Sequence, residues 1–188
     1  MIKKYKLYKL YGAGGQSESN EKLNKTLIFI TKLLNKHNIQ NWFISYGTLL
    51  GIIRNNSCID NDDDIDISCN ADDYDNIKKI LIQNELQIVT NDIRMGRKIL
   101  KTKSNNKFAS IDFYMCKIDN RSNFVDTWDG SIWSNCYTSN NKLIEFKWND
   151  TILYLPNNFK EKIKRRYGDD WEIPNLNSKG VEPRNNIL

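Results

Sequence analysis

The sequence predicts an α+β fold, in which a mixed β-sheet is flanked by helices. The chain of 188 residues has the length of one domain and can bury a core, so we expect a single domain over 1–188 with its core at about 20–174. Apolar side chains recur at helical spacing within 20–36, 70–81 and 159–167. Shorter apolar or alternating segments predict strands at 42–45, 64–68, 86–89, 97–102, 107–116, 143–146 and 151–155.

The N-terminal elements begin with a Gly/Ser loop, Gly12–Ser19, which follows a possible first strand. The helix predicted over 20–36 is amphipathic, because its leucines and isoleucine recur every three or four positions. After the next strand, Gly47 and Thr48 precede a short apolar helix at 49–53.

The later elements are bounded by capping and turn residues. Asn70 is the predicted N-cap of the second helix, with Asp73 three positions further as in a capping box. The polar stretch 117–141 predicts a long loop or insertion, and the last two strands predict a hairpin. Gly168 is expected to end the third helix, and the polar tail 175–188 is expected to be loosely ordered.

Charge and cysteine content exclude some classes of protein. The formal net charge of +5 is modest, so a nucleic-acid partner is not expected. The four cysteines form no Cys-x-x-Cys pair and the single histidine is His37, so we expect reduced thiols rather than a structural zinc site.

Targeting signals are missing from the sequence. The basic N-terminus has no continuous apolar run, so it is not a signal peptide, and no apolar stretch reaches the ~18 residues of a membrane span. We therefore expect a cytoplasmic protein. Its richness in Asn, Lys and Ile is typical of an AT-rich microbial or viral genome.

Two acids lie on the strand predicted at 64–68. Residues two apart on a strand point to the same side, so Asp64 and Asp66 share one face with Cβ atoms roughly 6–7 Å apart. Ile65 and Ile67 point to the opposite face and can enter the core. A carboxylate pair of this kind suits hard cations such as Mg²⁺ or Mn²⁺, and it can bridge two ions.

A third acid, Asp112, interrupts the apolar segment 108–114, where an acid is unexpected unless it has a partner. If that strand pairs beside 64–68, the three acids converge. The alternative is that Asp112 is an acid at a strand edge, bonded to backbone.

The two acids of 64–68 belong to a larger acidic block without lysine or arginine, and that block has two other interpretations. An EF-hand starting at Asp60 would need glycine where Ile65 stands and glutamate where Ala71 stands, so it fails. A purely solvated acidic face does not explain the interleaved isoleucines. The block comprises Asp60, Asp62, Asp63, Asp64, Asp66, Asp72, Asp73 and Asp75.

A phosphate-binding turn is predicted upstream of the acids. Gly47 and Thr48 lie at a strand-to-helix turn, where backbone N–H groups can approach a phosphate. Arg54, one short helix later, can contact phosphate oxygens in a bidentate way. This pattern is weak alone and becomes specific beside a metal-binding acid pair.

The run YGTLLGIIRNNSCIDNDDDIDIS, 46–68, closely resembles the signature of LicD-type proteins, which include bacterial phosphocholine transferases and the fukutin-related proteins of animals. The resemblance covers about 42–174, most of the chain. Its further matches are Ile111-Asp112-Phe113, Leu155-Pro156, Tyr167-Gly168-Asp169 and Pro174.

The resemblance implies a polymerase-β-like nucleotidyltransferase fold and an enzyme that moves a phospho-alcohol, such as phosphocholine or ribitol phosphate, from a CDP-linked donor to a sugar hydroxyl of a glycan. By position, Asp64, Asp66 and Asp112 would be catalytic and would hold Mg²⁺ or Mn²⁺. Gly47, Thr48 and the arginine that ends the helix, Arg54 in this chain, would bind the donor, and CMP would leave.

Two features of the sequence leave alternatives open. The family usually has Pro-Trp where this chain has Asp60-Asn61, which puts the donor headgroup and acceptor in question. A nucleotidyltransferase that moves NMP from an NTP to RNA, a sugar or a small molecule, with release of pyrophosphate, shares the same motif. A degenerate fold that serves as a binding module is a third hypothesis.

Several aromatic and basic residues outside the motif can be interpreted in two ways. Trp128 and Trp133 can stack on a sugar or anchor the core, and the latter is the favoured interpretation. Arg97 and Lys98 can face the donor or lie on a solvated strand edge. The basic cluster within 160–166 is expected to be the solvated face of a helix.

Overall fold

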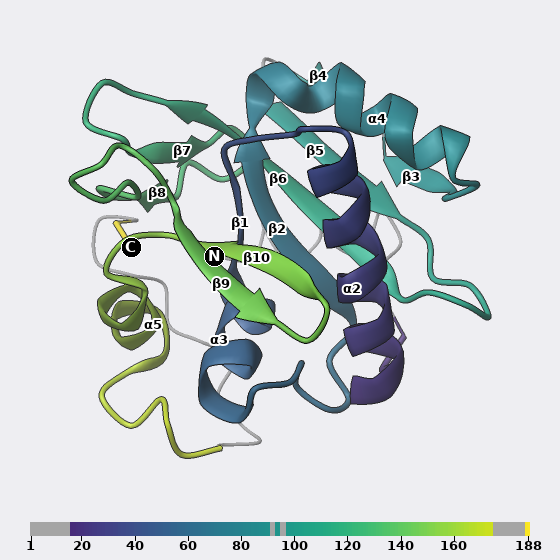
Figure 1. Cartoon of the computed structure of the whole chain (residues 1–188), viewed down its shortest axis with the longest axis horizontal. Helices are drawn as coiled ribbons and strands as arrows, with labels where there is room; N and C mark the ends of the chain where they lie inside the picture. The colour runs from purple at the N-terminus through teal and green to yellow at the C-terminus, as the bar shows by residue number, and fades with distance from the viewer. Residues whose placement is uncertain (1–15, 91–92, 95–96, 175–186) are drawn as a thin grey trace.

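A mixed β-sheet runs through the computed structural model, which describes residues 16–90, 93–94, 97–174 and 187–188 (Figure 1). Its strands are β1 (Trp42–Ile44), β2 (Asp64–Asn70), β3 (Ile88–Thr90), β4 (Ile93–Arg94), β5 (Arg97–Thr102), β6 (Ser110–Ile118), β7 (Phe124–Asp126) and β8 (Ile132–Trp133). The main path follows the order β1-β2-β6-β5-β3, while β4 pairs with β5 and β7 joins β6 to β8. The strands β2 and β6 are parallel, whereas β1–β2, β5–β6 and β3–β5 are antiparallel.

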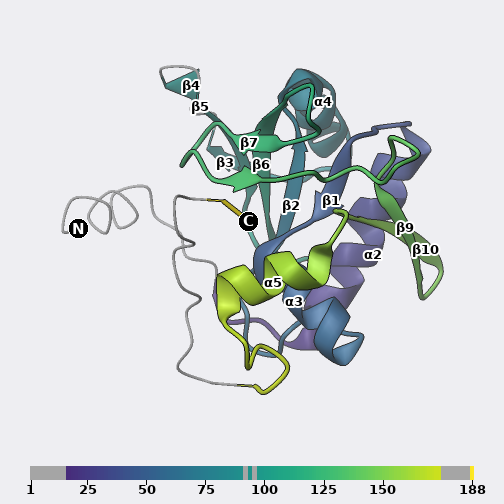
Figure 2. The ribbon, with the colours of Figure 1, turned by 90° about the vertical axis from the view of Figure 1, so that its left-hand side faces the viewer.

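Four helices and a separate hairpin accompany this sheet within the described residues. The helices are α2 (Asn20–Lys36), α3 (Tyr46–Asn55), α4 (Tyr74–Gln83) and α5 (Phe159–Tyr167), and the hairpin consists of β9 (Ile144–Trp148) and β10 (Thr151–Leu155). Figures 1 and 2 show α2 and the hairpin on the same side of the sheet, with α3 and α5 near its lower end. The α+β prediction is therefore confirmed, as is the predicted hairpin.

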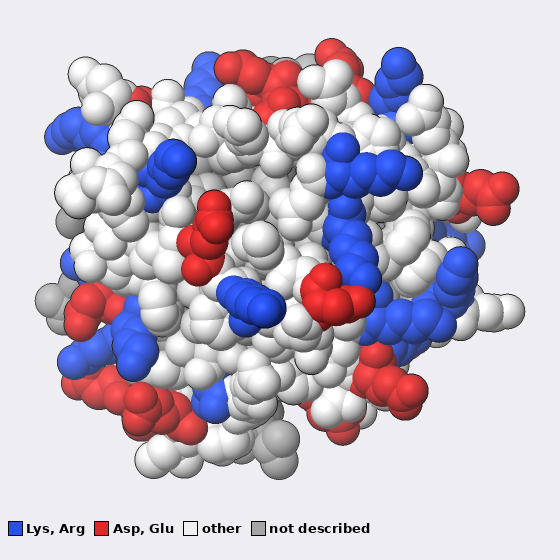
Figure 3. Space-filling view, viewed as in Figure 1, with Lys and Arg blue, Asp and Glu red and all other residues white. Residues whose placement is uncertain are grey.

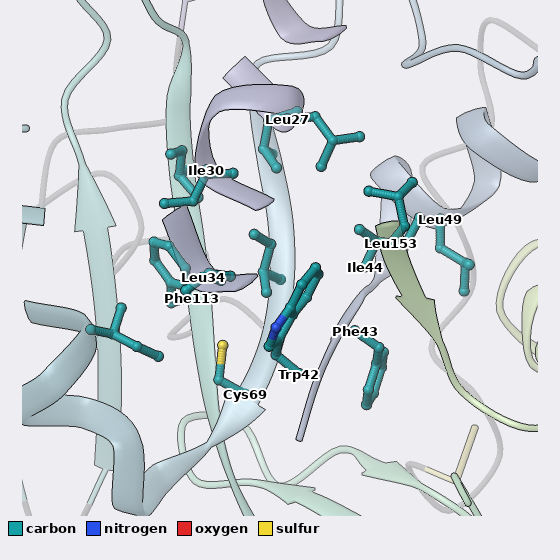
Figure 4. Packing of buried hydrophobic residues seen from close by; sticks show 14 of the residues in the cluster. Leu27, Ile30, Leu34, Trp42, Phe43, Ile44, Leu49, Cys69, Phe113 and Leu153 are labelled. Carbon is teal, nitrogen blue, oxygen red and sulfur yellow. The ribbon is translucent and has the colours of Figure 1, made fainter. Parts of the chain in front are cut away.

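The core lies between α2, the hairpin and the sheet (Figure 4). Leu27, Ile30 and Leu34 of α2 are fully buried, which accounts for the helical spacing of the sequence. Trp42 of β1 and Phe113 of β6 are also fully buried and approach them from the sheet. Each such side chain contributes roughly 1.5–3 kcal/mol through burial, so the layers hold one another in place.

Capping residues set the helix boundaries near the positions that the sequence predicts. The Ser19 hydroxyl accepts from the backbone N–H of Lys22 at the start of α2. Asn70 is a cap as predicted, but it caps a 3-10 turn, η1 (Ala71–Asp73), and α4 follows directly. Gly168 ends α5 with a φ of 97°, a conformation that glycine adopts without strain.

The predicted long loop at 117–141 is wrong in part, because it contains β7 and β8. With three and two residues, Phe124–Asp126 and Ile132–Trp133, these strands are too short to show an alternating pattern in the sequence. The Thr127 hydroxyl donates to the Met115 carbonyl, and Asp126 accepts from the Trp128 N–H. Polar residues that bond backbone in this way can lie in or beside a sheet without losing their hydrogen bonds.

The chain ends are described only in part. The predicted loop at Gly12–Ser19 and the possible strand before it fall mainly on residues 1–15, which lie outside the described residues, as do 175–186. Of the tail, only the last two residues are described, so the expectation of a loosely ordered tail stays a prediction. Ile187 forms a parallel bridge to Ile132 and Leu188 is 1 % exposed.

Lysine side chains gather along α2 on the face seen in Figure 3. This stripe is partly compensated, because Lys32 pairs with Asp150 of the β9–β10 turn. No helix of the described part of the chain has both the length and the apolar character that crossing a membrane requires.

Candidate active site

Three predicted acids meet where β2 and β6 run side by side. The parallel register pairs Asp66 with Asp112, and Asp64 with Ser110. Register partners on adjacent strands share a face, and residues two apart on a strand share it as well. Asp66 is 7 % exposed and Asp112 is 3 % exposed, so the sheet brings the carboxylates together in a buried place.

The opposite face of β2 explains why the sequence alternates. Ile65 and Ile67 are fully buried and belong to the same core cluster as the apolar face of α2. Their burial fixes the register of β2, because a shift by one residue would expose them and bury the acids in the core. The core therefore aims the carboxylates.

The acids raise one another's pKa. Burial, followed by the charges of Asp66 and Asp112, raises the pKa of Asp64 to about 11. Burial and the neighbouring charges hold the pKa of Asp66 well above its usual range, and burial raises that of Asp112. Like charges in a desolvated site favour the protonated form unless a cation compensates them. The group is therefore suited to holding a cation.

Protein groups already engage two of the three acids. The Lys101 ammonium on β5 donates to Oδ2 of Asp112, its register partner. The backbone N–H of Gly47 donates to Oδ2 of Asp66 at 3.0 Å, and a hydrogen bond from Tyr114 lowers the pKa of Asp66. These contacts orient the carboxylates toward the first turn of α3, where Gly47 lies, and toward β5.

Gly47 and Thr48 pack directly against the acids. The Thr48 hydroxyl is buried and accepts from the backbone N–H of Asp66 at 2.9 Å. A Cβ at Gly47 would lie 2.7 Å from Oδ2 of Asp62 and 3.5 Å from Oδ2 of Asp66. Only glycine fits here without moving a carboxylate, so this turn positions the acids; its role in donor binding stays a prediction.

Tyr46, which precedes Gly47, has an unusual backbone. Its φ is 43°, in the left-handed region that costs a non-glycine residue roughly 1 kcal/mol or more. Edge-to-face contacts hold its ring, at 4.9 Å from Tyr114 and 5.2 Å from Trp133. A strained conformation that several contacts enforce beside buried acids is typical of a functional site.

Arg54 lies away from this turn, at the last turn of α3. Its guanidinium donates to the Trp171 carbonyl at 3.5 Å and so connects α3 with the segment after α5. The proposed phosphate contact of Arg54 stays a prediction.

The basic face of α5 is solvated only in part: Lys160, Lys164 and Arg165 are exposed as predicted, whereas Lys162 and Arg166 are not. Lys162 is 3 % exposed, and its ammonium donates to the Ser134 carbonyl at 2.6 Å. The guanidinium of Arg166 lies 5.5 Å from the centre of the Tyr46 ring. Tyr167 is close enough to the acids that burial, followed by the charge of Asp66, raises its pKa. Part of α5 therefore faces the site.

The aromatic candidates divide. Trp133 is 2 % exposed and is a core anchor, as favoured from the sequence, while Trp128 is half-buried at the β7–β8 turn. The side chains of Arg97 and Lys98 lie outside the part of the structure whose side chains are described.

The donor set is suited to a hard divalent ion. Carboxylate oxygens of Asp62, Asp63 and Asp64 lie within 4.8 Å of one another, so these three residues could together hold a metal ion. Asp64 belongs both to this group and to the predicted set with Asp66 and Asp112. Oxygen-only ligands with excess negative charge are those that Mg²⁺ and Mn²⁺ prefer.

Sequence reasoning missed Lys101, Tyr114 and Arg166. Tyr114 follows Asp112 at the period-2 position, so strand alternation could have found it. Lys101 becomes visible only through the antiparallel β5–β6 register, and Arg166 only through the packing of α5 beside Tyr46.

The fold places the chain in a known class. A solved structure of the lincosamide antibiotic adenylyltransferase LnuA, with lincomycin bound, matches it with a TM-score of 0.50 and 13 % identity, over 71 % of this chain and 79 % of that one. The fold is thus that of the nucleotidyltransferases, as expected. None of the curated protein sequences compared with the chain matches it.

The family follows from the sequence match. The model of the LicD/FKTN/FKRP nucleotidyltransferase domain matches residues 38–166, well over half of the chain, and the chain therefore belongs to this family. Family and fold together support a transferase of the phosphotransferase or nucleotidyltransferase type.

Proposed function

We propose that the protein is a metal-dependent transferase that moves a phospho-alcohol from a CDP-linked donor to a sugar hydroxyl of a glycan, with CMP as the leaving group. The observation that carries the proposal is the β2–β6 register, which sets Asp66 beside Asp112 at the Gly47 turn in a member of the LicD family. Phosphocholine and ribitol phosphate are the groups that the family favours.

Asp64 and Asp66, with Asp112 or the neighbouring Asp62 and Asp63, would hold Mg²⁺ or Mn²⁺. When bound, such an ion supplies compensation of the negative charge that gathers on the phosphates during transfer. The fit rests on the oxygen-only donor set and on the raised pKa of Asp64, which indicates that negative charge is undercompensated.

The transfer itself needs an activated hydroxyl and an aligned donor. The acceptor oxygen would attack the β-phosphorus of the donor, the bond from that phosphorus to the bridging oxygen would break, and CMP would leave. The proton of the acceptor hydroxyl would pass to Asp112, whose raised pKa makes it a better base than an exposed aspartate. Tyr114 and Gly47 would keep Asp66 in orientation.

Donor phosphates would lie between the Gly47 turn and α5. Arg166 is the cation that the structure places at Tyr46, one residue before that turn. A guanidinium can bind two phosphate oxygens at once, so Arg166 is a stronger candidate than Arg54, which contacts the Trp171 carbonyl.

The second candidate is a nucleotidyltransferase that moves NMP from an NTP to RNA, a sugar or a small molecule, with release of pyrophosphate. The structural likeness to an adenylyltransferase favours it, because that protein combines the same fold with transfer to an antibiotic. The two reactions differ in the phosphorus attacked and in the product, CMP or pyrophosphate.

A thermal-shift panel would test the choice of donor. CDP, CDP-choline, CDP-ribitol, CTP, ATP, GTP and UTP would each be measured with and without Mn²⁺, since a ligand of the folded state raises Tm by mass action. We expect a Mn²⁺-dependent rise with CDP compounds that disappears in Asp64→Ala. A rise with NTPs alone would favour the second candidate, and no rise would favour a binding module. Chromatography of CMP and pyrophosphate would then identify the product.

A further inference from the structure

Lys101 occupies the place beside Asp112 where a cation is needed. It lies on β5 directly opposite Asp112 of β6, and its ammonium donates to Oδ2 of that carboxylate. The side chains are 18 % and 4 % exposed, so the pair is largely shielded from water. A shielded ion pair is strong while both partners are present and costly to break unless another charge replaces one of them.

Asp112 lies between two strands that carry side chains of opposite charge next to it. On one side the β5 register supplies Lys101, and on the other the β2 register supplies Asp66. The three residues form a row across β5, β6 and β2, which Figure 1 shows side by side. Asp112 can therefore face a fixed ammonium or join the other carboxylates around an ion.

The charges of this row and of the neighbouring Asp64 explain why Asp112 can either pair with Lys101 or bind an ion. Asp64, Asp66 and Asp112 carry three negative charges when ionised, and Lys101 returns one. A single divalent ion brings this group of four to neutrality. Lys101 already supplies one positive charge to this group through its contact with Asp112, so it performs in part the electrostatic role of an ion.

We infer that Lys101 is a built-in counter-ion that competes with the divalent ion for Asp112. It holds Asp112 in position while the metal is absent, and it releases this carboxylate when the metal binds. This inference rests on the proposed function, because it assumes that the acids hold a metal. It adds a positioning residue that lies outside the motif of the family resemblance.

Mn²⁺ alone is sufficient as the probe. The metal-free protein would be titrated with Mn²⁺, and the signal of the free ion would be followed by electron paramagnetic resonance. Lys101→Gln keeps a hydrogen-bond donor and removes the charge, so we expect Mn²⁺ to bind about tenfold more tightly. Lys103→Gln is the matched control, because Lys103 is an exposed lysine just beyond the end of β5, and it should leave the affinity unchanged.

A double-mutant cycle separates competition from a general change in charge. If Lys101 acts through Asp112, then Lys101→Gln should have no effect on Mn²⁺ affinity in the Asp112→Asn background. Equal tightening in both backgrounds would overturn the inference, as would an unchanged affinity in Lys101→Gln alone.

A charge-conserving variant guards against loss of the fold. Lys101→Arg retains the pair with Asp112 and should bind Mn²⁺ no more tightly than the wild type, and tighter binding would contradict the inference. Circular dichroism would check the fold of each variant. Because no donor or acceptor enters these titrations, failure of CDP compounds to bind would reject the proposed function and leave the inference standing. Mn²⁺ affinity that does not change in Lys101→Gln would reject the inference and leave the proposed function standing.

Discussion

Asp66 and Asp112 of the sheet and Asp126 at the end of β7 are buried alike, but their surroundings differ. In the turn, Asp126 accepts from the Trp128 N–H and Asp129 accepts from the Ser131 N–H, each at 2.8 Å. These carboxylates close a local turn. In the sheet, Asp66 and Asp112 come from strands far apart in sequence and face each other across a parallel pair.

A raised pKa does not distinguish the two groups. Burial, followed by the Asp129 charge, raises the pKa of Asp126 to about 8, and burial with neighbouring acids raises that of Asp64 to about 11. The two groups differ in that the turn carboxylates accept hydrogen bonds from neighbouring backbone N–H groups, whereas the sheet carboxylates converge from separate elements. Convergence has no local structural use, which makes it the better indicator of a functional site.

The largest expected effect is the loss of activity when a carboxylate of the sheet site is removed. Asp64→Ala should reduce CMP release by on the order of 10³-fold or more, because it removes a metal-holding carboxylate. Removing an acid from a group of like charges relieves repulsion, so the fold should be kept. Circular dichroism and the initial rate of CMP release would be measured together.

Asp126→Asn is the matched control for that substitution, and it should keep most of the activity. Comparable loss in both variants would mean that the turn belongs to the active site. Unfolding of Asp64→Ala would make the sheet acids structural.

The second effect is a pH dependence of the free energy of unfolding, and it tests whether Asp126 of the turn is buried. The folded protein holds the Asp126 proton more tightly than the unfolded chain, whose aspartates titrate near ~4. This stabilisation is fully present below that value and is lost as pH rises through about 8. Relative to Asp126→Asn, the wild-type free energy of unfolding should therefore fall by on the order of 5 kcal/mol between pH 4 and pH 8.

Urea denaturation in the presence of a chelator would measure the free energy of unfolding at several pH values and so give its slope against pH. The exposed Asp72 provides a control, and Asp72→Asn should keep the wild-type slope. If Asp126→Asn also keeps it, the turn acid is solvated and the comparison between the two groups loses its basis.

The third effect sharpens the comparison through two glycines of α3. A Cβ at Gly47 meets a carboxylate oxygen of Asp62, whereas a Cβ at Gly51 meets backbone, at 2.7 Å from the Ser57 oxygen and 2.9 Å from the Ile59 nitrogen. Gly47→Ala should thus displace an acid and slow catalysis by roughly 10–100-fold with little loss of stability. Gly51→Ala should instead destabilise the fold by about 1–3 kcal/mol.

Initial rates and thermal melts of both variants would show whether the effects separate in this way. A Gly47→Ala enzyme with wild-type rates would mean that the turn does not position the acids.

Much of this site could be predicted from local patterns, and the remainder depends on packing. The alternation at Asp64 and Asp66 and the isolated acid Asp112 are visible in the sequence, because burial of the intervening isoleucines dictates the pattern. The contacts of Lys101 and Arg166 are not visible, since they depend on the β5–β6 register and on how α5 docks. The strands β7 and β8 are not visible either, because three and two residues are too few to show an alternating pattern.

The smallest expected effect concerns Tyr46, which lies between the two groups of acids. Its ring contacts Tyr114 of the sheet site, while the charges of Asp129 and Asp126 contribute to its raised pKa. Arg166 lies over this ring, and the exposed Arg165 carries the same charge one residue earlier. Arg166→Ala should raise the KM for the donor about tenfold with little change in kcat, because it removes a contact made equally in the ground and transition states.

Arg165→Ala should leave both constants unchanged, and donor titrations of CMP release would compare the two variants. Equal effects of both substitutions would point to the general positive charge of α5 as the cause, because Arg165 does not share the position of Arg166 over Tyr46. An effect confined to Arg166 would place the donor phosphates beside Tyr46, because the guanidinium of Arg166 lies 5.5 Å from the centre of that ring.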